Sequence, residues 1–207
     1  LSSEFYWSRS QKVSENIQWY EVVEETERLL LNATKLRLRT DVEFALLLSG
    51  GIDSGLIAAL AATNSSSRLK TISASFPGFP VDEGPAAKMV AERYGTDHHT
   101  VVLDRPNKNS IREAVSAFDE PQGDPSIIPS YFLSKFSSSM VKVLINGEGS
   151  DESFAGYRRH RAVYVKEKLK RSLPNFLTSL LQEMPGHLPA PVKQRGRYEF
   201  FYRFLEG

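Results

Sequence analysis

The chain has 207 residues, with 26 lysines and arginines against 25 aspartates and glutamates, and a formal net charge of +1 at pH 7. This balance argues against a nucleic-acid partner held by net positive charge, and no apolar run is long enough to span a membrane. The absence of cysteine excludes disulfides and thiol catalysis within the chain and suits a cytoplasmic location. We expect one α/β domain with a sizeable core.

The first predicted strand, residues 44–48, leads into Ser49-Gly50-Gly51-Ile52-Asp53-Ser54 and then a helical pattern at 55–60. A strand, a glycine turn and a helix start form an anion site, because glycine lets the backbone approach a ligand and the helix points unpaired N–H groups at it. Asp53 would repel a phosphate unless a hard cation bridged them. The loop therefore predicts a phosphate and Mg²⁺ site. The simpler alternative is a polar turn that caps the helix.

Further along the chain, strands and helices alternate. The patterns predict strands at 69–76, 98–103 and 141–145, the last one buried, and helices at 86–94, 109–118 and 128–138, the first of them ending at Gly95. Alternation of this kind favours a parallel sheet covered by helices on both faces. With the strand order 3-2-1-4, the first and fourth strands would be neighbours where the winding reverses, which is where such sheets bind ligands. His98 and His99 would point to opposite faces of their strand and have structural roles.

A second loop, Asn146-Gly147-Glu148-Gly149-Ser150-Asp151-Glu152, follows the fourth strand directly. The first and second loops would then form two walls of one crevice. Asp53 and Asp151 would face each other across it, and two ionised carboxylates need a cation to lie close together. The alternative for each is an acidic residue that stabilises a helix start.

Both loops carry a family resemblance. The Walker A spacing and the dinucleotide glycine fingerprint are absent, whereas Ser-Gly-Gly-x-Asp-Ser after a strand resembles the PP-loop of the N-type ATP pyrophosphatases. The second loop, with Ser153-Phe154-Ala155-Gly156-Tyr157, resembles a block of the class B asparagine synthetases and their β-lactam-forming relatives. The resemblance runs from about Phe5 to Arg161 and includes these stretches: Tyr6-Trp7-Ser8, Asp41-Val42-Glu43, Asp119-Glu120-Pro121 and Asp124-Pro125-Ser126. It implies an adenine nucleotide alpha hydrolase-like (PP-loop ATPase) fold.

The resemblance also implies a reaction with ATP and Mg²⁺. A carboxylate, aspartate by default, would attack the α-phosphorus of ATP to give an acyl-adenylate and pyrophosphate, and nitrogen would then be transferred to it. The implied contacts with ATP or pyrophosphate are Leu48, Ser49, Gly50, Gly51, Asp53, Ser54, Ala74, Asn146 and Gly147. Asp53 and Asp151 resemble Mg²⁺ ligands. Glu148 would orient the substrate or take a proton from the incoming nitrogen, which makes Asp53, Glu148 and Asp151 the catalytic set.

The chain departs from the family at both ends. The glutamine-hydrolysing members resemble one another in an N-terminal glutaminase domain with a cysteine nucleophile, which this chain lacks. A pyrophosphate-contacting lysine of the family lies well past the second motif, and Lys166, Lys168 and Lys170 come too early to match it. We expect a lead-in and helix at 1–40, a PP-loop domain at 41–172 and the start of a helical part at 173–207. The partners would be a separate glutaminase domain or subunit, a further C-terminal half, and ammonia or glutamine-derived nitrogen.

Two other functions stay open. The chain could be a non-catalytic nucleotide-binding subunit or fragment, although Asp53, Glu148 and Asp151 argue otherwise. It could also be a PP-loop enzyme with a different acceptor, such as a tRNA-thiolating enzyme. The absent cysteines and the weak positive charge argue against that function.

Overall fold

The computed structural model describes residues 16–80 and 82–172, together with residues 4, 189, 198 and 202. The chain divides into two compact units, Leu1–Gly147 and Glu148–Gly207. The stretch at residues 6–8 and almost all of the predicted helical part at 173–207 lie outside the described residues. The predicted domain boundaries stay predictions.

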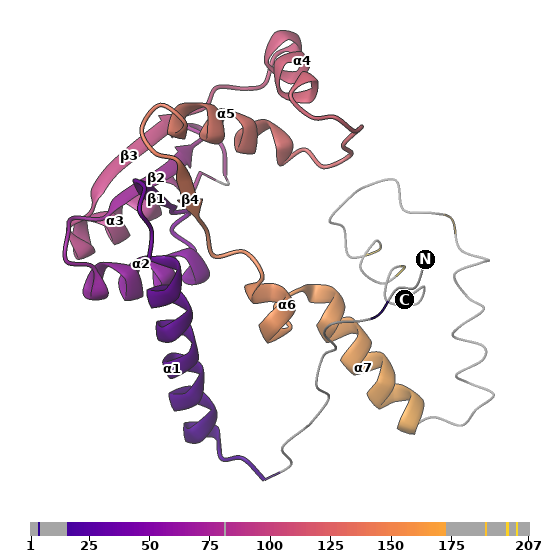
Figure 1. The fold of residues 1–207 in the computed structure, drawn as a ribbon. Coiled ribbons are helices and arrows are strands. Elements are labelled where there is room, and N and C mark those ends of the chain that lie inside the picture. The colour runs from indigo at the N-terminus through magenta and orange to yellow at the C-terminus, as the bar shows by residue number, and fades with distance from the viewer. Residues whose placement is uncertain are drawn as a thin grey trace. The chain divides into compact units, whose positions relative to one another are not determined.

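Helices and strands alternate through the first unit, as the sequence predicts (Figure 1). Its elements are α1 (Trp19–Arg37), β1 (Phe44–Leu47), α2 (Ile52–Asn64), β2 (Lys70–Ser75), α3 (Gly84–Tyr94), β3 (Asp97–Val102), α4 (Lys108–Ser116), α5 (Ile127–Ser137) and β4 (Val143–Ile145). The second unit contains α6 (Ser150–Phe154) and α7 (Arg158–Ser172). Helix α3 begins two residues earlier than predicted, because Pro85 fits the first turn of a helix. It ends at Gly95 with φ of 62°, as predicted.

The strands form one parallel sheet in the order β3-β2-β1-β4, which confirms the predicted fold class and strand order. Leu46 of β1 is in register with Thr71 of β2 on one side and with Ile145 of β4 on the other. The prediction of a buried fourth strand is wrong. Val143 is 38% exposed, because among the described residues β4 has a neighbouring strand on one side only, while Val141 before the strand is buried.

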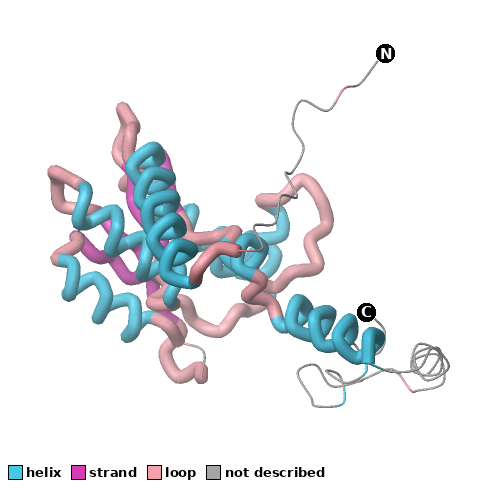
Figure 2. Tube along the Cα trace, turned by 90° about the horizontal axis from the view of Figure 1, so that it is seen from below, coloured by secondary structure: helices cyan, strands magenta, loops and turns pink. Residues whose placement is uncertain are grey.

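Helices cover both faces of the sheet (Figure 2). On one face, Leu46 and Leu48 pack with alanines of α2 and α3, and these small side chains let the helices approach the strands closely. On the other face, Ala45 and Ile72 pack with Leu133 of α5. The core is therefore built on β1 and β2, and Leu48, the first residue of the loop after β1, is itself buried.

The two adjacent histidines of β3 do point to opposite faces. His98 Nδ1 lies 2.9 Å from Thr71 Oγ1, which in turn bonds to Thr96 Oγ1 at 2.8 Å. His99 lies instead against the ring of Phe136 on α5. Burial lowers the pKa of His98, so this imidazole is kept neutral within a hydroxyl network. Both histidines have structural surroundings, as predicted.

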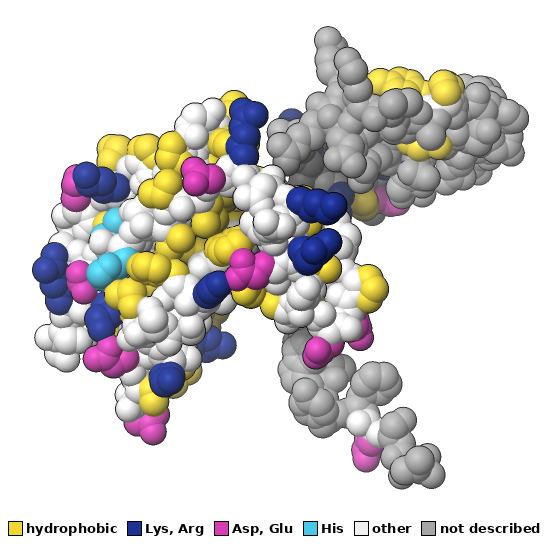
Figure 3. Space-filling view, turned by 90° about the horizontal axis from the view of Figure 1, so that it is seen from above, with side chains coloured by type: hydrophobic (Ala, Val, Ile, Leu, Met, Phe, Trp, Pro, Cys, Tyr) yellow, Lys and Arg dark blue, Asp and Glu magenta, His cyan; other side chains and the backbone are white. Residues whose placement is uncertain are grey.

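Acidic and basic side chains are interspersed over the described residues on the face shown in Figure 3. No helix in the described part of the chain is long and apolar enough to cross a membrane. Within those same residues, no group of three or more histidine, aspartate or glutamate side chains is placed to hold a metal ion by itself.

Candidate functional site

The loop after β1 closes on itself through two hydroxyl groups. Leu48 donates its N–H to the Ile72 carbonyl at 2.8 Å, which fixes the start of the loop to the neighbouring strand β2. The hydroxyls of Ser49 and Ser54 share a hydrogen bond of 2.8 Å, and Ser54 Oγ also accepts the Ser49 N–H at 3.2 Å. Gly50 makes the turn with φ of 78°, a value that residues with a Cβ rarely adopt. The loop is therefore a closed ring of hydrogen bonds around a glycine turn.

Helix α2 starts at this loop without a side-chain cap. Its N-cap residue is Gly51, and no side chain accepts a hydrogen bond from the first turn. Among the described residues Asp53 accepts no hydrogen bond from the first turn, whereas Ser54 Oγ accepts the Ser49 N–H, so Asp53 is not the cap that the simpler alternative supposes. Gly51, Ile52 and Asp53 are all exposed. An open helix N-terminus with hydroxyls beside it is a donor set that fits a phosphate group.

Asp53 gives the same loop a carboxylate. It lies in the first turn of α2 and is exposed. A carboxylate next to a phosphate site suits a divalent cation that binds oxygen atoms of both groups. The residues therefore fit Mg²⁺ together with a phosphorylated ligand.

The loop after β4 reaches the same helix start. A Cβ built on Gly147 would lie 3.2 Å from the Asp53 carbonyl carbon and 3.2 Å from the Ser54 nitrogen. Because β1 and β4 are parallel neighbours, their carboxyl ends meet at one edge of the sheet. The first unit thus brings together residues 48–54 and Gly147, as the sequence predicts, and glycine at 147 allows the close approach.

Helix α3 supports the glycine loop from behind. A Cβ on Gly50 would lie 2.5 Å from the Ala87 nitrogen and 2.7 Å from the Ala86 Cβ. Ala74, predicted to flank the adenine, lies near the carboxyl end of β2, beside the same loop region. The contact between Gly50 and α3 could not be predicted from the sequence, because residues 50 and 87 meet only in the folded chain.

The second unit explains the spacing of the second motif. Gly149, with φ of 96°, precedes α6, and the Gly156 N–H donates to the Asp151 carbonyl at 3.0 Å. A Cβ on Gly156 would collide with Asp151 Oδ1, so this glycine makes room for the predicted Mg²⁺ ligand.

Tyr157 donates its hydroxyl to Glu152 Oε1 at 2.6 Å, and this bond lowers the pKa of Glu152 and raises the pKa of Tyr157. The glutamate and tyrosine of the motif therefore hold the segment around Asp151 in shape. This role was not predicted from the sequence, where the five-residue spacing of Glu152 and Tyr157 was the available signal. The roles of Glu148, Asp151 and Asn146 stay predictions.

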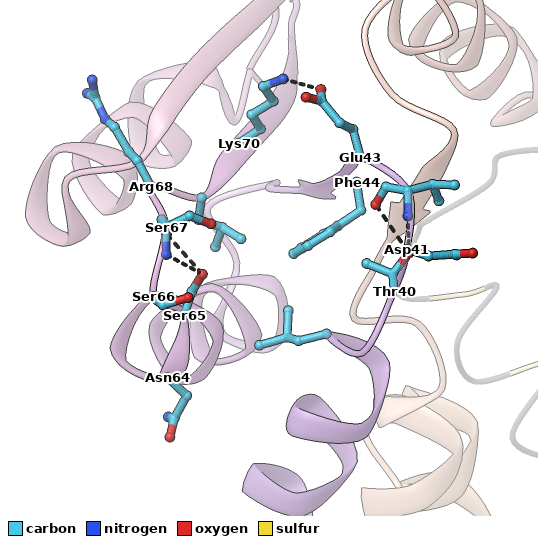
Figure 4. A pocket seen from close by; sticks show the side chains of 13 residues that line it. Thr40, Asp41, Glu43, Phe44, Asn64, Ser65, Ser66, Ser67, Arg68 and Lys70 are labelled. Carbon is cyan, nitrogen blue, oxygen red and sulfur yellow. Dashed lines mark hydrogen bonds and ion pairs between the residues drawn. The ribbon is translucent and has the colours of Figure 1, made fainter.

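A cavity of about 520 Å³ lies at the amino ends of β1 and β2, at the opposite end of these strands from the glycine loop (Figure 4). Lys70 and Glu43 point toward one another there, with Lys70 Nζ 2.5 Å from Glu43 Oε2. Its lining also includes Asp41 and the serines of the α2–β2 connection. Parallel sheets bind ligands at their carboxyl edge, so this cavity is separate from the predicted site.

Comparisons with known proteins agree with the two motifs. The model of the asparagine synthase family matches residues 25–203. A putative glutamine-hydrolysing asparagine synthetase of Methanocaldococcus jannaschii is 34% identical over 166 residues, which cover 79% of this chain and 32% of that protein. The glutamine-hydrolysing asparagine synthetase 1 of Bacillus subtilis is 31% identical over 179 residues, which cover 86% of this chain and 28% of that protein. The chain thus spans about a third of the length of these relatives.

Among solved structures, the ammonia-dependent NAD synthetase of Campylobacter jejuni matches with a TM-score of 0.43 and 18% identity, over 68% of this chain and 61% of that one.

Proposed function

Because the chain belongs to the asparagine synthase family, we propose that it carries the ATP-binding part of an AMP-forming amide ligase. The observation that supports this proposal best is the meeting of the two glycine loops. The open start of α2 and Gly147 lie together at the carboxyl edge of two neighbouring parallel strands. This is the position where sheets of this kind hold nucleotides.

In the proposed reaction, a carboxylate attacks the α-phosphorus of ATP, and the bond to the β-phosphate oxygen breaks. The products are an acyl-adenylate and pyrophosphate, and a nitrogen nucleophile then displaces AMP. We take aspartate as the carboxylate, and ammonia or glutamine-derived ammonia as the nitrogen, because the relatives are asparagine synthetases.

The glycine loop would bind the leaving pyrophosphate. Negative charge grows on that group as the bond breaks, and backbone N–H groups of the α2 start, with the hydroxyls of Ser49 and Ser54, are donors fixed in advance. Mg²⁺, when bound by Asp53 and Asp151, would neutralise part of this charge. Asp151 belongs to the second unit, and its role rests on the motif alone.

The remaining roles follow the same assignment. The backbone at Leu48 and Ala74 would flank the adenine, and Asn146 with Gly147 would line the opposite side of the nucleotide. Glu148 would orient the substrate or accept the proton of the incoming nitrogen. A proton acceptor must lie within hydrogen-bond reach of that nitrogen, which a complex with an acyl-adenylate analogue would reveal.

The test is release of AMP and pyrophosphate by the 207-residue chain with ATP, Mg²⁺, aspartate and ammonia. We expect equal amounts of both products, dependence on aspartate, and no release by Asp53→Ala. The matched control is Asp41→Ala, which removes the same charge at the opposite edge of the sheet and should keep activity. Formation of ADP, or full activity of Asp53→Ala, would refute the proposal. Mg²⁺-dependent ATP binding with no AMP would indicate a non-catalytic chain or another acceptor.

A further inference from the structure

One carboxylate joins the end of β2 to the start of α3. Asp82 Oδ1 accepts the N–H of Phe76 at 2.9 Å and the N–H of Gly84 at 3.0 Å, and its Oδ2 accepts the Ser75 hydroxyl at 3.2 Å. The Phe76 N–H holds the pKa of Asp82 below its ordinary value. An ionised carboxylate that accepts several hydrogen bonds makes stronger bonds than a neutral side chain would.

The end of β2 and the start of α3 are tightly packed against each other. Gly84 is buried, and a Cβ on it would lie 2.6 Å from the Ser75 Cβ and 2.7 Å from Ser75 Oγ. The first residue of α3 therefore lies directly on the last residue of β2. Asp82 holds together two segments that leave no free space between them.

The same helix turn supports the glycine loop. Ala86 and Ala87 follow Gly84 in α3 and lie against Gly50, where even a Cβ would collide. A shift of the α3 start therefore changes the space available to Gly50, because packed interiors transmit small displacements. On its other side, the carboxylate fixes Phe76, two residues beyond Ala74.

We infer that Asp82 is a positioning residue for the nucleotide, acting through α3 on the Gly50 turn and through β2 on Ala74. It touches neither the ATP nor the reacting atoms in this proposal. The inference rests on the proposed function, because it assumes that ATP binds at the glycine loop.

The test is equilibrium binding of Mg²⁺-ATP by calorimetry, with the full 207-residue chain and three variants. Asp82→Ala should weaken ATP binding about tenfold, since a small misplacement of binding groups is costly. Asp82→Asn should stay within about threefold of the wild type, because its amide oxygen still accepts the two N–H groups and its NH₂ can donate to Ser75. Glu83→Ala, the matched control, removes an exposed neighbouring carboxylate and should leave binding unchanged.

A merely structural role would give another result. It would reduce the fraction of folded, binding-competent chains, seen as fewer sites per molecule with an unchanged Kd. Hydrogen exchange of the Phe76 and Gly84 amides reports directly on their hydrogen bonds to Asp82, and we expect it to be faster in Asp82→Ala only. An unchanged Kd in Asp82→Ala, with or without loss of sites, overturns the positioning role alone. A wild-type chain that binds no ATP overturns the proposed function as well.

Discussion

Gly50→Ala tests the packing behind the glycine loop, and two other glycines separate the causes. Gly50 combines φ of 78° with a Cβ position 2.5 Å from the Ala87 nitrogen. Gly78 has a similar φ of 82° and nothing within 4 Å of its Cβ position. Gly51 has a negative φ of −70°, and its Cβ would meet only Ser49 Oγ at 3.3 Å. Gly50→Ala therefore combines backbone strain with a collision, Gly78→Ala introduces backbone strain alone, and Gly51→Ala introduces neither.

The expected losses of stability follow from these contacts. Alanine in the left-handed region costs about 1–2 kcal/mol, which is all we expect for Gly78→Ala. Gly50→Ala adds about 1–3 kcal/mol for overpacking against α3, and reaches roughly 2–5 kcal/mol in total. Gly51→Ala should cost less than about 1 kcal/mol, a small effect at a helix N-cap. A loss at the upper end would consume much of the ~5–15 kcal/mol stability of a typical domain.

Urea unfolding followed by far-UV circular dichroism measures the free energy of unfolding of each variant. The difference between Gly50→Ala and Gly78→Ala is the cost of the collision. If the two variants lose equal stability, the contact between the loop and α3 is not tight. Asp82 could then not position Gly50 through α3.

Two further predictions follow from the same unit. Gly147→Ala should weaken Mg²⁺-ATP binding roughly threefold to tenfold, because its Cβ presses on the start of α2; Gly123→Ala, with open space around it, is the control, and equal affinities in calorimetry would contradict the prediction. For His98, burial lowers the folded-state pKa, so between that value and the unfolded pKa of about 6.5 the unfolded chain binds more protons. Stability should therefore fall as the pH drops below about 6.5. His98→Gln should flatten this dependence in urea titrations from pH 8 to pH 5.5, and an unchanged slope would rule out His98 as its source.

The fold was predictable because its signals are local. Apolar runs such as residues 44–48 mark strands, and Gly95 marks the end of a helix, so element order and parallel pairing follow with few alternatives. The glycine loop was equally visible, since a turn between a strand and a helix needs only neighbouring residues. The exposure of Val143 was missed although the strand order 3-2-1-4 places the fourth strand at an edge, because the apolar run at 141–145 by itself resembles a buried strand.

The contacts that hold the glycine loop in place were much less predictable. Asp82 accepts hydrogen bonds from residues 75, 76 and 84, and the collision partners of Gly50 lie more than thirty positions along the chain. The available signal was an aspartate just before Gly84-Pro85 at a helix start, a pattern typical of capping loops. Such a pattern predicts a helix boundary, and the tight packing behind it appears only in the assembled sheet.

The hydrogen bond between Ser49 and Ser54 has a consequence for the thermodynamics of ligand entry. Because these hydroxyls bond each other at 2.8 Å, the loop is held closed before any ligand arrives, and part of the conformational entropy of ordering it is lost when the chain folds. A phosphate that takes either hydroxyl exchanges one hydrogen bond for another, so this pair adds little net enthalpy. Affinity at such a loop comes from charge and from backbone N–H groups, and the serines keep those groups aligned.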